Sequence, residues 1–170
     1  MGERILVIGG GIAGLSTALA LARAGLELTV LERDPPPPET SADEAFDKWE
    51  RKGVGHLRHS HAFLARLHML IRDNYPELMT DLLSAGCREI IFSDNLPIAL
   101  RDEYEPMSGD KDMTILTSRR TTLELIMRRY AARQQNIRFV TGALVRGLTT
   151  EKDERGALRV TGVRVEENGE

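Results

Sequence analysis

The residues best suited to chemistry lie close to the start of the chain. Residues 9–14 read Gly-Gly-Gly-Ile-Ala-Gly and satisfy the spacing G-x-G-x-x-G. In this pattern the first glycine permits a tight turn out of a strand, the second lets the backbone approach a pyrophosphate, and the third lets a helix pack against the sheet. The helix N-terminus then presents N–H groups and a positive dipole end to the phosphates. The predicted phosphate cradle consists of Gly9, Gly11, Ile12, Ala13 and Gly14.

A single acidic residue, Glu32, supplies the second half of the predicted site. It follows Gly14 by eighteen residues and ends the second of two short apolar runs. A carboxylate at that position accepts hydrogen bonds from both hydroxyls of a ribose, and it would repel the 2′-phosphate of NADP. The alternative is a glycine-rich structural turn with a solvated Glu32, which the surrounding strand and helix signals disfavour. The segment from Gly9 to Glu32 therefore predicts a site for the AMP half of FAD or NAD.

Three predicted elements must position these residues. Ile5 to Ile8 is a wholly apolar run followed by glycines, which is typical of a strand buried on both faces. Ile12 to Ala24 has helical periodicity, and Gly25 is placed to end the helix. Leu28 to Leu31 is a second buried strand, which completes a βαβ unit. The predicted fold class is α/β, a three-layer Rossmann-like domain.

The middle of the chain departs from a plain series of strands and helices. Pro35 to Pro38 excludes regular structure, and Glu39 to Gly55 is polar enough to predict an irregular surface segment. The predicted helices are Ser60 to Arg72 and a second that starts at Pro76 and stops at Gly86. The predicted strands are Ile90 to Phe92, Leu96 to Leu100 and Met113 to Thr117. We assign residues 88–117 to part of an inserted, mainly β substrate domain.

The last fifty residues return to a regular pattern. Arg119 to Gln134 is predicted as a helix, capped either by Thr121 with Glu124 or by Ser118. The predicted strands are Ile137 to Val140, Ala143 to Thr149 and Leu158 to Val165, with a bulge near Gly162. Asn168-Gly169 is a hairpin signal with no strand after it. We therefore expect residues 1–170 to be a truncated FAD-binding domain, although a frayed terminus explains the signal equally well.

The length of the middle region favours FAD over NAD as the cofactor. About eighty residues lie between Arg33 and the helix at Arg119, whereas an NAD domain continues promptly into further βα units. Such an insertion is easier to explain when the chain wraps a long flavin cofactor. FAD is therefore the predicted cofactor.

Four segments resemble a known family. They are Gly9 to Arg33, Arg58-His59-Ser60-His61, Ser118 to Glu124 and Gly142 to Val165. Together they are similar to the start of FAD-dependent oxidoreductases of the p-hydroxybenzoate hydroxylase type, a superfamily that holds flavin monooxygenases, halogenases and geranylgeranyl reductases. The later D-G and G-D motifs of that family are not found in this sequence.

The resemblance implies a role for particular residues. Glu32 would hold the adenosine ribose, Arg33 would flank the adenine, and the Val145 backbone would contact the adenine. Arg58 would lie near the flavin, and Arg120 would reach the cofactor. The resemblance also implies a small-molecule substrate, with NAD(P)H as external reductant or a separate flavin reductase as partner. No catalytic acid or base can be named from these residues.

Other candidates have simpler interpretations. His56, His59 and His61 could supply three zinc ligands, but no fourth is evident and no metal is predicted. We expect Trp49 and Phe46 to pin the acidic segment to the core. Further interpretations are a buried Cys87, a surface position for His68 and a solvated Arg119.

Composition narrows the class of protein. The 170 residues carry a net charge of −3 with no basic block, which argues against nucleic acid as a partner. Arg23 and Glu27 interrupt the apolar stretch near the N-terminus, so neither a membrane span nor a signal peptide is predicted. One cysteine excludes an internal disulfide and fits a reducing cytoplasm. The predicted function is FAD-dependent oxidation, closest to a flavin monooxygenase; the alternatives are an NAD-dependent dehydrogenase and a non-catalytic nucleotide-binding fragment.

Overall fold

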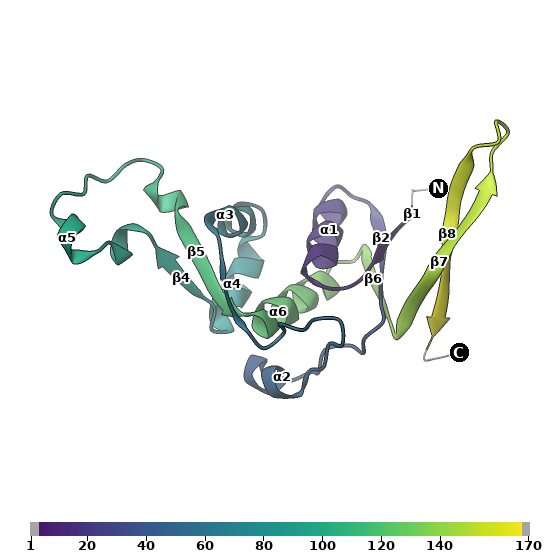
Figure 1. Ribbon diagram of the computed structural model, residues 1–170, viewed down its shortest axis with the longest axis horizontal. Helices are drawn as coiled ribbons and strands as arrows, with labels where there is room; N and C mark the ends of the chain where they lie inside the picture. Colours follow the sequence, from purple (N-terminus) through teal and green to yellow (C-terminus); the bar gives the residue numbers. More distant parts are fainter. Residues whose placement is uncertain (1–3, 168–170) are drawn as a thin grey trace. The chain divides into compact units, whose positions relative to one another are not determined.

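The computed structural model describes residues 4–167, so the Asn168-Gly169 hairpin signal lies outside the described residues. The chain divides into two compact units (Figure 1). The first unit contains residues 1–37 and 128–170, and the second contains residues 38–127. The assignment of residues 88–117 to a substrate domain stays a prediction.

A parallel sheet forms the centre of the first unit. It contains β1 (Arg4–Ile8), β2 (Glu27–Glu32) and β6 (Ile137–Thr141) in the order β1-β2-β6. All pairings are parallel, with Ile5 opposite Leu28 and Leu28 opposite Ile137. The predicted α/β class is confirmed, because helix α1 (Ile12–Arg23) joins two parallel strands in a βαβ unit. Figure 1 shows β2 between its two neighbours.

Helix α1 forms where its apolar residues share one face. Leu15, Ala18 and Leu19 are buried on this face. The helix ends at Arg23, and the chain then turns through Gly25, whose φ of 81° favours glycine. This short connection brings the chain directly into β2, so that the ends of β1 and β2 lie side by side.

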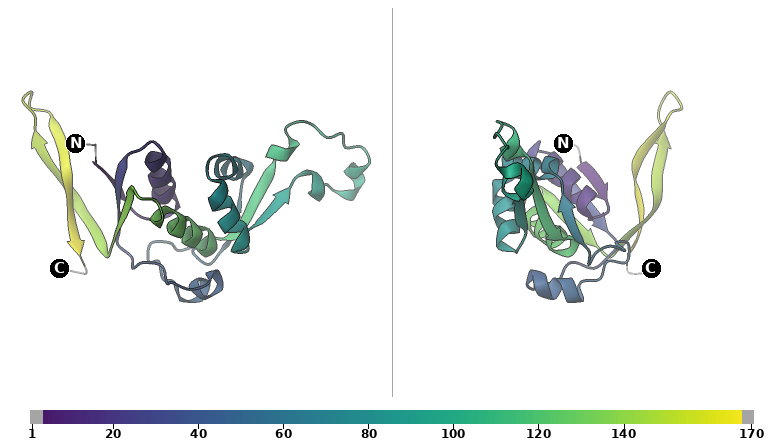
Figure 2. Two further views of the ribbon diagram at one scale, coloured as in Figure 1. Left: turned by 180° about the vertical axis from the view of Figure 1, so that it is seen from behind. Right: turned by 60° about the vertical axis from the view of Figure 1, so that its left-hand side comes forward.

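A long two-stranded hairpin completes the first unit (Figure 2). It consists of β7 (Ala143–Lys152) and β8 (Leu158–Glu167), which pair antiparallel. The register shifts between Val145 and Gly147 and again between Thr149 and Thr150, opposite Gly162. The bulge predicted near Gly162 is therefore confirmed.

The second unit mixes short helices with a small antiparallel sheet. The sheet has the order β3-β5-β4 and contains β3 (Ser60–Phe63), β4 (Arg88–Ile91) and β5 (Thr114–Arg119). Its helices are α2 (Ala42–Lys48), α3 (Ala65–Asn74), α4 (Pro76–Ser84) and α5 (Ile98–Arg101). Two 3₁₀ turns cover Ser93–Asn95 and Asp110–Asp112. Helix α6 (Arg120–Ala132) follows β5 and continues into the first unit.

The acidic segment after the prolines is more ordered than predicted. It contains α2, which Ser41 caps by accepting the N–H of Glu44 at 3.2 Å. Trp49 follows the helix and is buried with Ala45 and Leu125. The prediction that Trp49 anchors this segment is confirmed, and the prediction of an irregular segment was wrong because it overlooked the cap.

Two further elements differ from the prediction. Ser60 to Phe63 is not the start of a helix but a strand that pairs with Leu116 to Arg119, a long-range contact that overrides local helical spacing. Leu96 to Leu100 is not a strand, because Pro97 lacks the N–H that a strand ladder needs and the chain forms the short helix α5 instead. The predicted strands in β4 and β5 are confirmed.

The predicted cap of α6 was also wrong. Thr121 lies inside the helix, and its hydroxyl donates to the Leu57 carbonyl at 2.6 Å. Ser118 lies in β5, and its hydroxyl donates to the Arg119 carbonyl at 2.9 Å. Strand β5 therefore runs directly into α6, and these side chains bond to neighbouring segments instead of capping the helix.

Candidate functional site

The glycine loop links β1 to α1 in the first unit. Gly9 has a φ of 96°, which favours glycine, and its N–H donates to the Leu31 carbonyl at 2.8 Å. A methyl group on Gly14 would lie 1.8 Å from the Gly9 carbonyl oxygen, so only glycine allows α1 to approach the loop this closely. A methyl group on Gly11 would meet no atom within 4 Å. The glycine loop is therefore closely packed where Gly14 meets Gly9, and it leaves open space at Gly11.

The first turn of α1 faces this opening. Gly11 is the N-cap, and no side chain caps the helix. No acidic residue lies in the first turn either. The N–H groups of Ile12, Ala13 and Gly14 belong to the set that a helix leaves without intrahelical partners, and the dipole adds partial positive charge there. The arrangement suits a phosphate or another anion.

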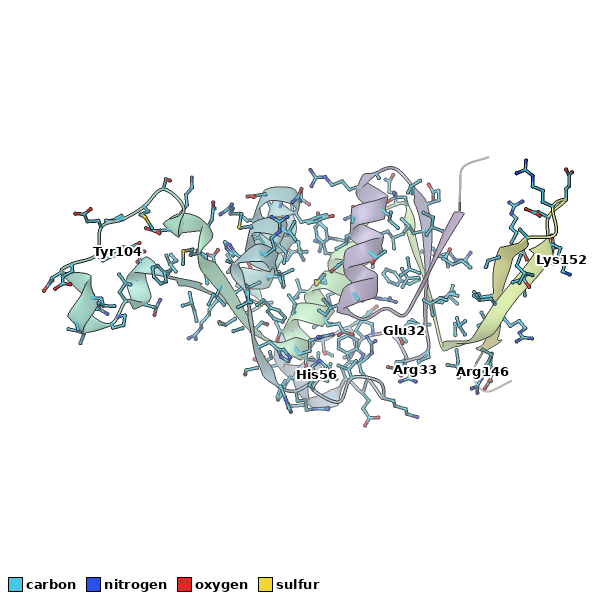
Figure 3. The ribbon with its side chains drawn as sticks, turned by 45° about the horizontal axis from the view of Figure 1, so that its top comes forward. Glu32, Arg33, His56, Tyr104, Arg146 and Lys152 are labelled. Atoms are coloured by element: carbon cyan, nitrogen blue, oxygen red, sulfur yellow. The ribbon has the colours of Figure 1, made fainter. Side chains whose placement is uncertain are left out.

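Glu32 lies at the end of β2 with its carboxylate fixed by the backbone (Figure 3). The residue is only 6% exposed. One oxygen accepts the Gly10 N–H at 2.7 Å, and the other accepts the Asp34 N–H at 2.9 Å. A carboxylate is an acceptor-only group with about four lone-pair sites, and these two bonds fix the orientation in which Glu32 presents them.

Gly10 and Asp34 take part in this arrangement although the motif did not single them out. A methyl group on Gly10 would lie 3.1 Å from the Glu32 carboxylate and 3.3 Å from a guanidinium nitrogen of Arg128. The available signal for this close packing was that Gly10, the middle of three consecutive glycines, occupies a position that the motif leaves open. Asp34 is buried and lies 3.7 Å from exposed Arg33, a separation that contributes little stability.

The remaining predicted residue of the first unit is Val145. It lies in β7 opposite Val165, directly before the first bulge of the hairpin. The structure therefore places Gly9 to Gly14, Glu32, Arg33 and Val145 in one compact unit. Arg58 and Arg120 belong to the second unit.

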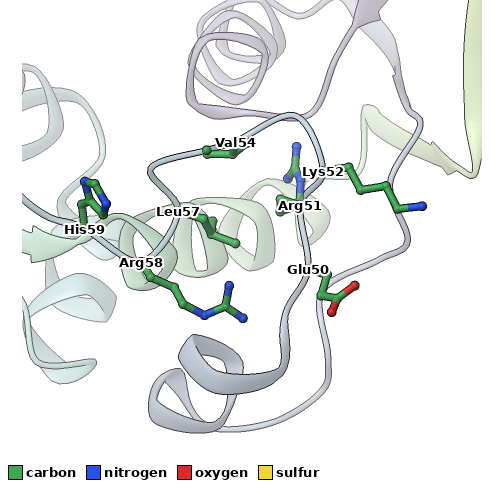
Figure 4. A pocket seen from close by; sticks show the side chains of 8 residues that line it. Glu50, Arg51, Lys52, Val54, Leu57, Arg58 and His59 are labelled. Atoms are coloured by element: carbon green, nitrogen blue, oxygen red, sulfur yellow. The ribbon is translucent and has the colours of Figure 1, made fainter.

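Arg58 lies in the loop that follows α2 and bonds back to the C-terminal end of that helix. Its guanidinium donates to the carbonyls of Asp47 at 3.0 Å and Trp49 at 3.4 Å. Beside it lies an open hollow of about 340 Å³ (Figure 4). The lining residues are Glu50, Arg51, Lys52, Val54, Gly55, Leu57, Arg58 and His59. The hollow is electropositive because Lys52 and Arg58 outnumber the one lining carboxylate, Glu50, while the charge of Arg51 is paired with Glu124.

Arg120 belongs to a buried charge cluster in the second unit. Glu124 is fully buried and pairs with Arg120 at 3.2 Å and, through its other oxygen, with Arg51. The His56 ring nitrogen lies 3.4 Å from the Arg120 guanidinium. Two guanidiniums around one carboxylate leave an excess positive charge. Arg51 was missed by sequence reasoning, since nothing local distinguishes it from the neighbouring Lys52.

His56, His59 and His61 lie close to one another in the second unit. The rings of His56 and His61 lie 5.3 Å apart, and His61 bonds to the His59 carbonyl. Among residues 4–167 no cluster of His, Cys, Asp and Glu could hold a metal ion. His68 is buried, not a surface residue, and its Nε2 lies 2.6 Å from Glu89. The reason is that α3 packs against β5 of the small sheet, a long-range contact that the sequence pattern alone did not reveal.

Two further predictions concern Arg119 and Cys87. Arg119 is not simply solvated, because it pairs with Asp43 and stacks 4.7 Å from the Phe46 ring. Cys87 is buried as predicted, and burial raises the pKa of its thiol, which donates to the Ser118 hydroxyl at 3.1 Å. Within the part of the chain that the structure describes, none of the helices is both long and apolar enough to cross a membrane.

The geometry of the first unit defines a class of protein. A parallel sheet, a glycine turn under a helix N-terminus and a buried carboxylate at the end of the next strand are features of the Rossmann-like α/β fold. Residues 4–161 match the family described as FAD dependent oxidoreductase. The chain therefore belongs to the FAD-dependent oxidoreductase family.

Individual relatives agree with this family. A flavin-dependent halogenase of Aspergillus niger is 32% identical over 88 residues, which cover 52% of this chain and 18% of the halogenase. A D-amino acid dehydrogenase of Methylobacterium sp. is 59% identical over 32 residues, 19% of this chain and 8% of that enzyme. The chain thus spans less than a fifth of these curated relatives.

Solved structures show the same fold. A probable FAD-dependent monooxygenase from Pseudomonas aeruginosa superposes with a TM-score of 0.59 at 16% identity, over 96% of this chain and 40% of that one. The p-nitrophenol 4-monooxygenase of Pseudomonas putida gives a TM-score of 0.58 at 15% identity, over 96% and 39%. Both neighbours are described as monooxygenases, and the predicted fold class is the one they share with this chain.

Proposed function

We propose that the first unit binds the AMP half of FAD and that the whole protein is a flavin monooxygenase. The observation that carries the proposal is the Glu32 carboxylate, which is buried and oriented by two backbone N–H groups at the end of β2. In this proposal the carboxylate accepts the ribose hydroxyls. The open face at Gly11 and the first turn of α1 receive the pyrophosphate.

The donor set fits the adenosine diphosphate part of FAD. The space beside Gly11 is open, and a side chain there would fill the place that a pyrophosphate needs. The positive end of the helix dipole matches the phosphate charge, and Glu32 matches neutral ribose hydroxyls. Arg33 flanks the adenine in this proposal, and the Val145 backbone contacts it. FAD, when bound, supplies the redox chemistry, while the chain supplies position and electrostatics.

The second unit contributes positive charge to the proposal. Arg58 borders the electropositive hollow, and Arg120 belongs to the buried cluster around Glu124. A cation held near a flavin stabilises negative charge on the reduced ring, so these arginines are the proposed contacts to the flavin end. The substrate is proposed to be a small molecule. The external reductant is NAD(P)H or a separate flavin reductase, and the compartment is the cytoplasm.

Two alternatives give different results in the same experiment. The first is an NAD-dependent dehydrogenase, and the second is a nucleotide-binding fragment without activity of its own. The purified chain should be titrated with FAD and with NAD, and its absorbance should be recorded after removal of free ligand. A flavin band near one equivalent supports the proposal. Binding of NAD without FAD favours the dehydrogenase and refutes the proposal. A folded chain that binds neither ligand favours the fragment without activity and also refutes the cradle.

A further inference from the structure

Arg128 is a buried cation in the first unit with no role in the site described so far. It lies in α6 and is only 8% exposed. Its guanidinium carbon lies 3.2 Å from the centre of the Phe139 ring, a cation–π stack between α6 and β6. A buried guanidinium needs partners that offset its lost hydration, and the flat ring face provides one of them.

The same guanidinium lies close to the ribose carboxylate. A methyl group on Gly10 would come within 3.3 Å of Arg128 Nη1 and within 3.1 Å of Glu32 Oε2. The opposite charges of Arg128 and Glu32 therefore both lie beside Gly10, where a methyl group would be tightly packed against each of them. Attraction between such groups is strong at low exposure, because water screens it little. A side chain at Gly10, a position that the motif leaves open, would therefore press on both charged groups.

We infer that Arg128 is a positioning residue, which holds the Glu32 carboxylate against the Gly10 N–H and aims it at the ribose of the nucleotide. Phe139 keeps the guanidinium in place, so the charge cannot swing into solvent. The inference deepens the proposed function and rests on it, since the ligand is an adenosine diphosphate group with free 2′ and 3′ hydroxyls. Arg128 itself contacts no ligand in this assignment.

The first test needs no ligand. Amide hydrogen exchange of Gly10 should be measured in the wild-type chain, in Arg128→Met, in Arg128→Lys and in the control Arg138→Met on the exposed side of β6. In Arg128→Met the Gly10 N–H should exchange about tenfold faster, since its acceptor is no longer held. The Leu28 N–H, which bonds to the Asn136 carbonyl in the same unit, should keep its rate. Lysine should restore part of the protection.

The second test separates ribose recognition from general damage. ADP and 2′,3′-dideoxy-ADP should be titrated into the same four proteins. Arg128→Met should weaken ADP about tenfold and leave the dideoxy analogue unchanged, because only ADP uses the carboxylate. Equal weakening of both ligands, or unchanged Gly10 exchange, overturns the positioning role. A wild-type chain that binds neither ligand refutes the proposed function, and the Gly10 exchange then decides the Arg128 assignment by itself.

Discussion

The substitution Glu32→Gln tests the ribose carboxylate with little change in shape. The side chain is 6% exposed and accepts the Gly10 N–H at 2.7 Å and the Asp34 N–H at 2.9 Å. Glutamine keeps one acceptor oxygen, but its NH₂ group cannot accept a hydrogen bond from a ribose hydroxyl. A hydrogen bond to a charged group contributes about 1.5–3 kcal/mol, so ADP binding should weaken roughly 10–150-fold.

The assay is calorimetric titration with ADP, with Glu27→Gln as the matched control. Glu27 begins the same strand and is exposed, so its variant removes the same charge without touching the site. Thermal unfolding without ligand should be recorded for both variants, because loss of the Gly10 bond also destabilises the loop. Unchanged ADP affinity in Glu32→Gln, or an equal loss in Glu27→Gln, would refute the assignment of Glu32 as the ribose acceptor.

Three further predictions follow from other contacts. Gly14→Ala should lower the free energy of unfolding by about 1–3 kcal/mol or more, because its methyl group would lie 1.8 Å from the Gly9 carbonyl oxygen. Urea unfolding measures this loss, and an unchanged midpoint of the urea transition would contradict the packing. Gly11→Ala should leave the free energy of unfolding unchanged, because its methyl group would meet no atom within 4 Å, but it should weaken FAD binding. A fluorescence titration with FAD measures the affinity. An affinity equal to that of the wild type would mean that no pyrophosphate approaches Gly11. The hydrogen bond from the Tyr104 hydroxyl to Asp110 favours the neutral phenol and raises the pKa of Tyr104 to about 12. In Asp110→Asn the midpoint of the ultraviolet titration of Tyr104 should therefore move toward pH 10. A titration curve identical to that of the wild type would exclude the contact.

The glycine loop could be predicted from the sequence because its constraints are local. Gly9, Gly14 and Glu32 act through a turn, a close helix contact and a strand end, and each follows directly from spacing along the chain. The same is true of Trp49, since a large apolar side chain in a polar segment is expected to be buried. Hydrophobic runs and turn residues carry this information without knowledge of distant partners.

Long-range partners explain what the sequence did not reveal. Ser60 to Phe63 becomes a strand because β5 lies beside it, more than fifty residues further along the chain. Glu124 matched a capping box, but its carboxylate instead pairs with Arg51 and Arg120 in the buried cluster. Arg128 and Gly10 meet only after α6 has packed near the glycine loop. Charged residues of this kind look like ordinary surface positions until the fold brings them together.

The most direct test of the central claim is a backbone-amide NMR titration of the chain with FAD. The account predicts that the largest shifts fall on residues 9–14 at the turn into α1 and on the end of β2, where Glu32 bonds to Gly10 and Asp34. Smaller shifts should follow at Val145. Shifts that cluster elsewhere in the first unit, or no shifts at saturating FAD, would contradict the cradle from Gly9 to Glu32.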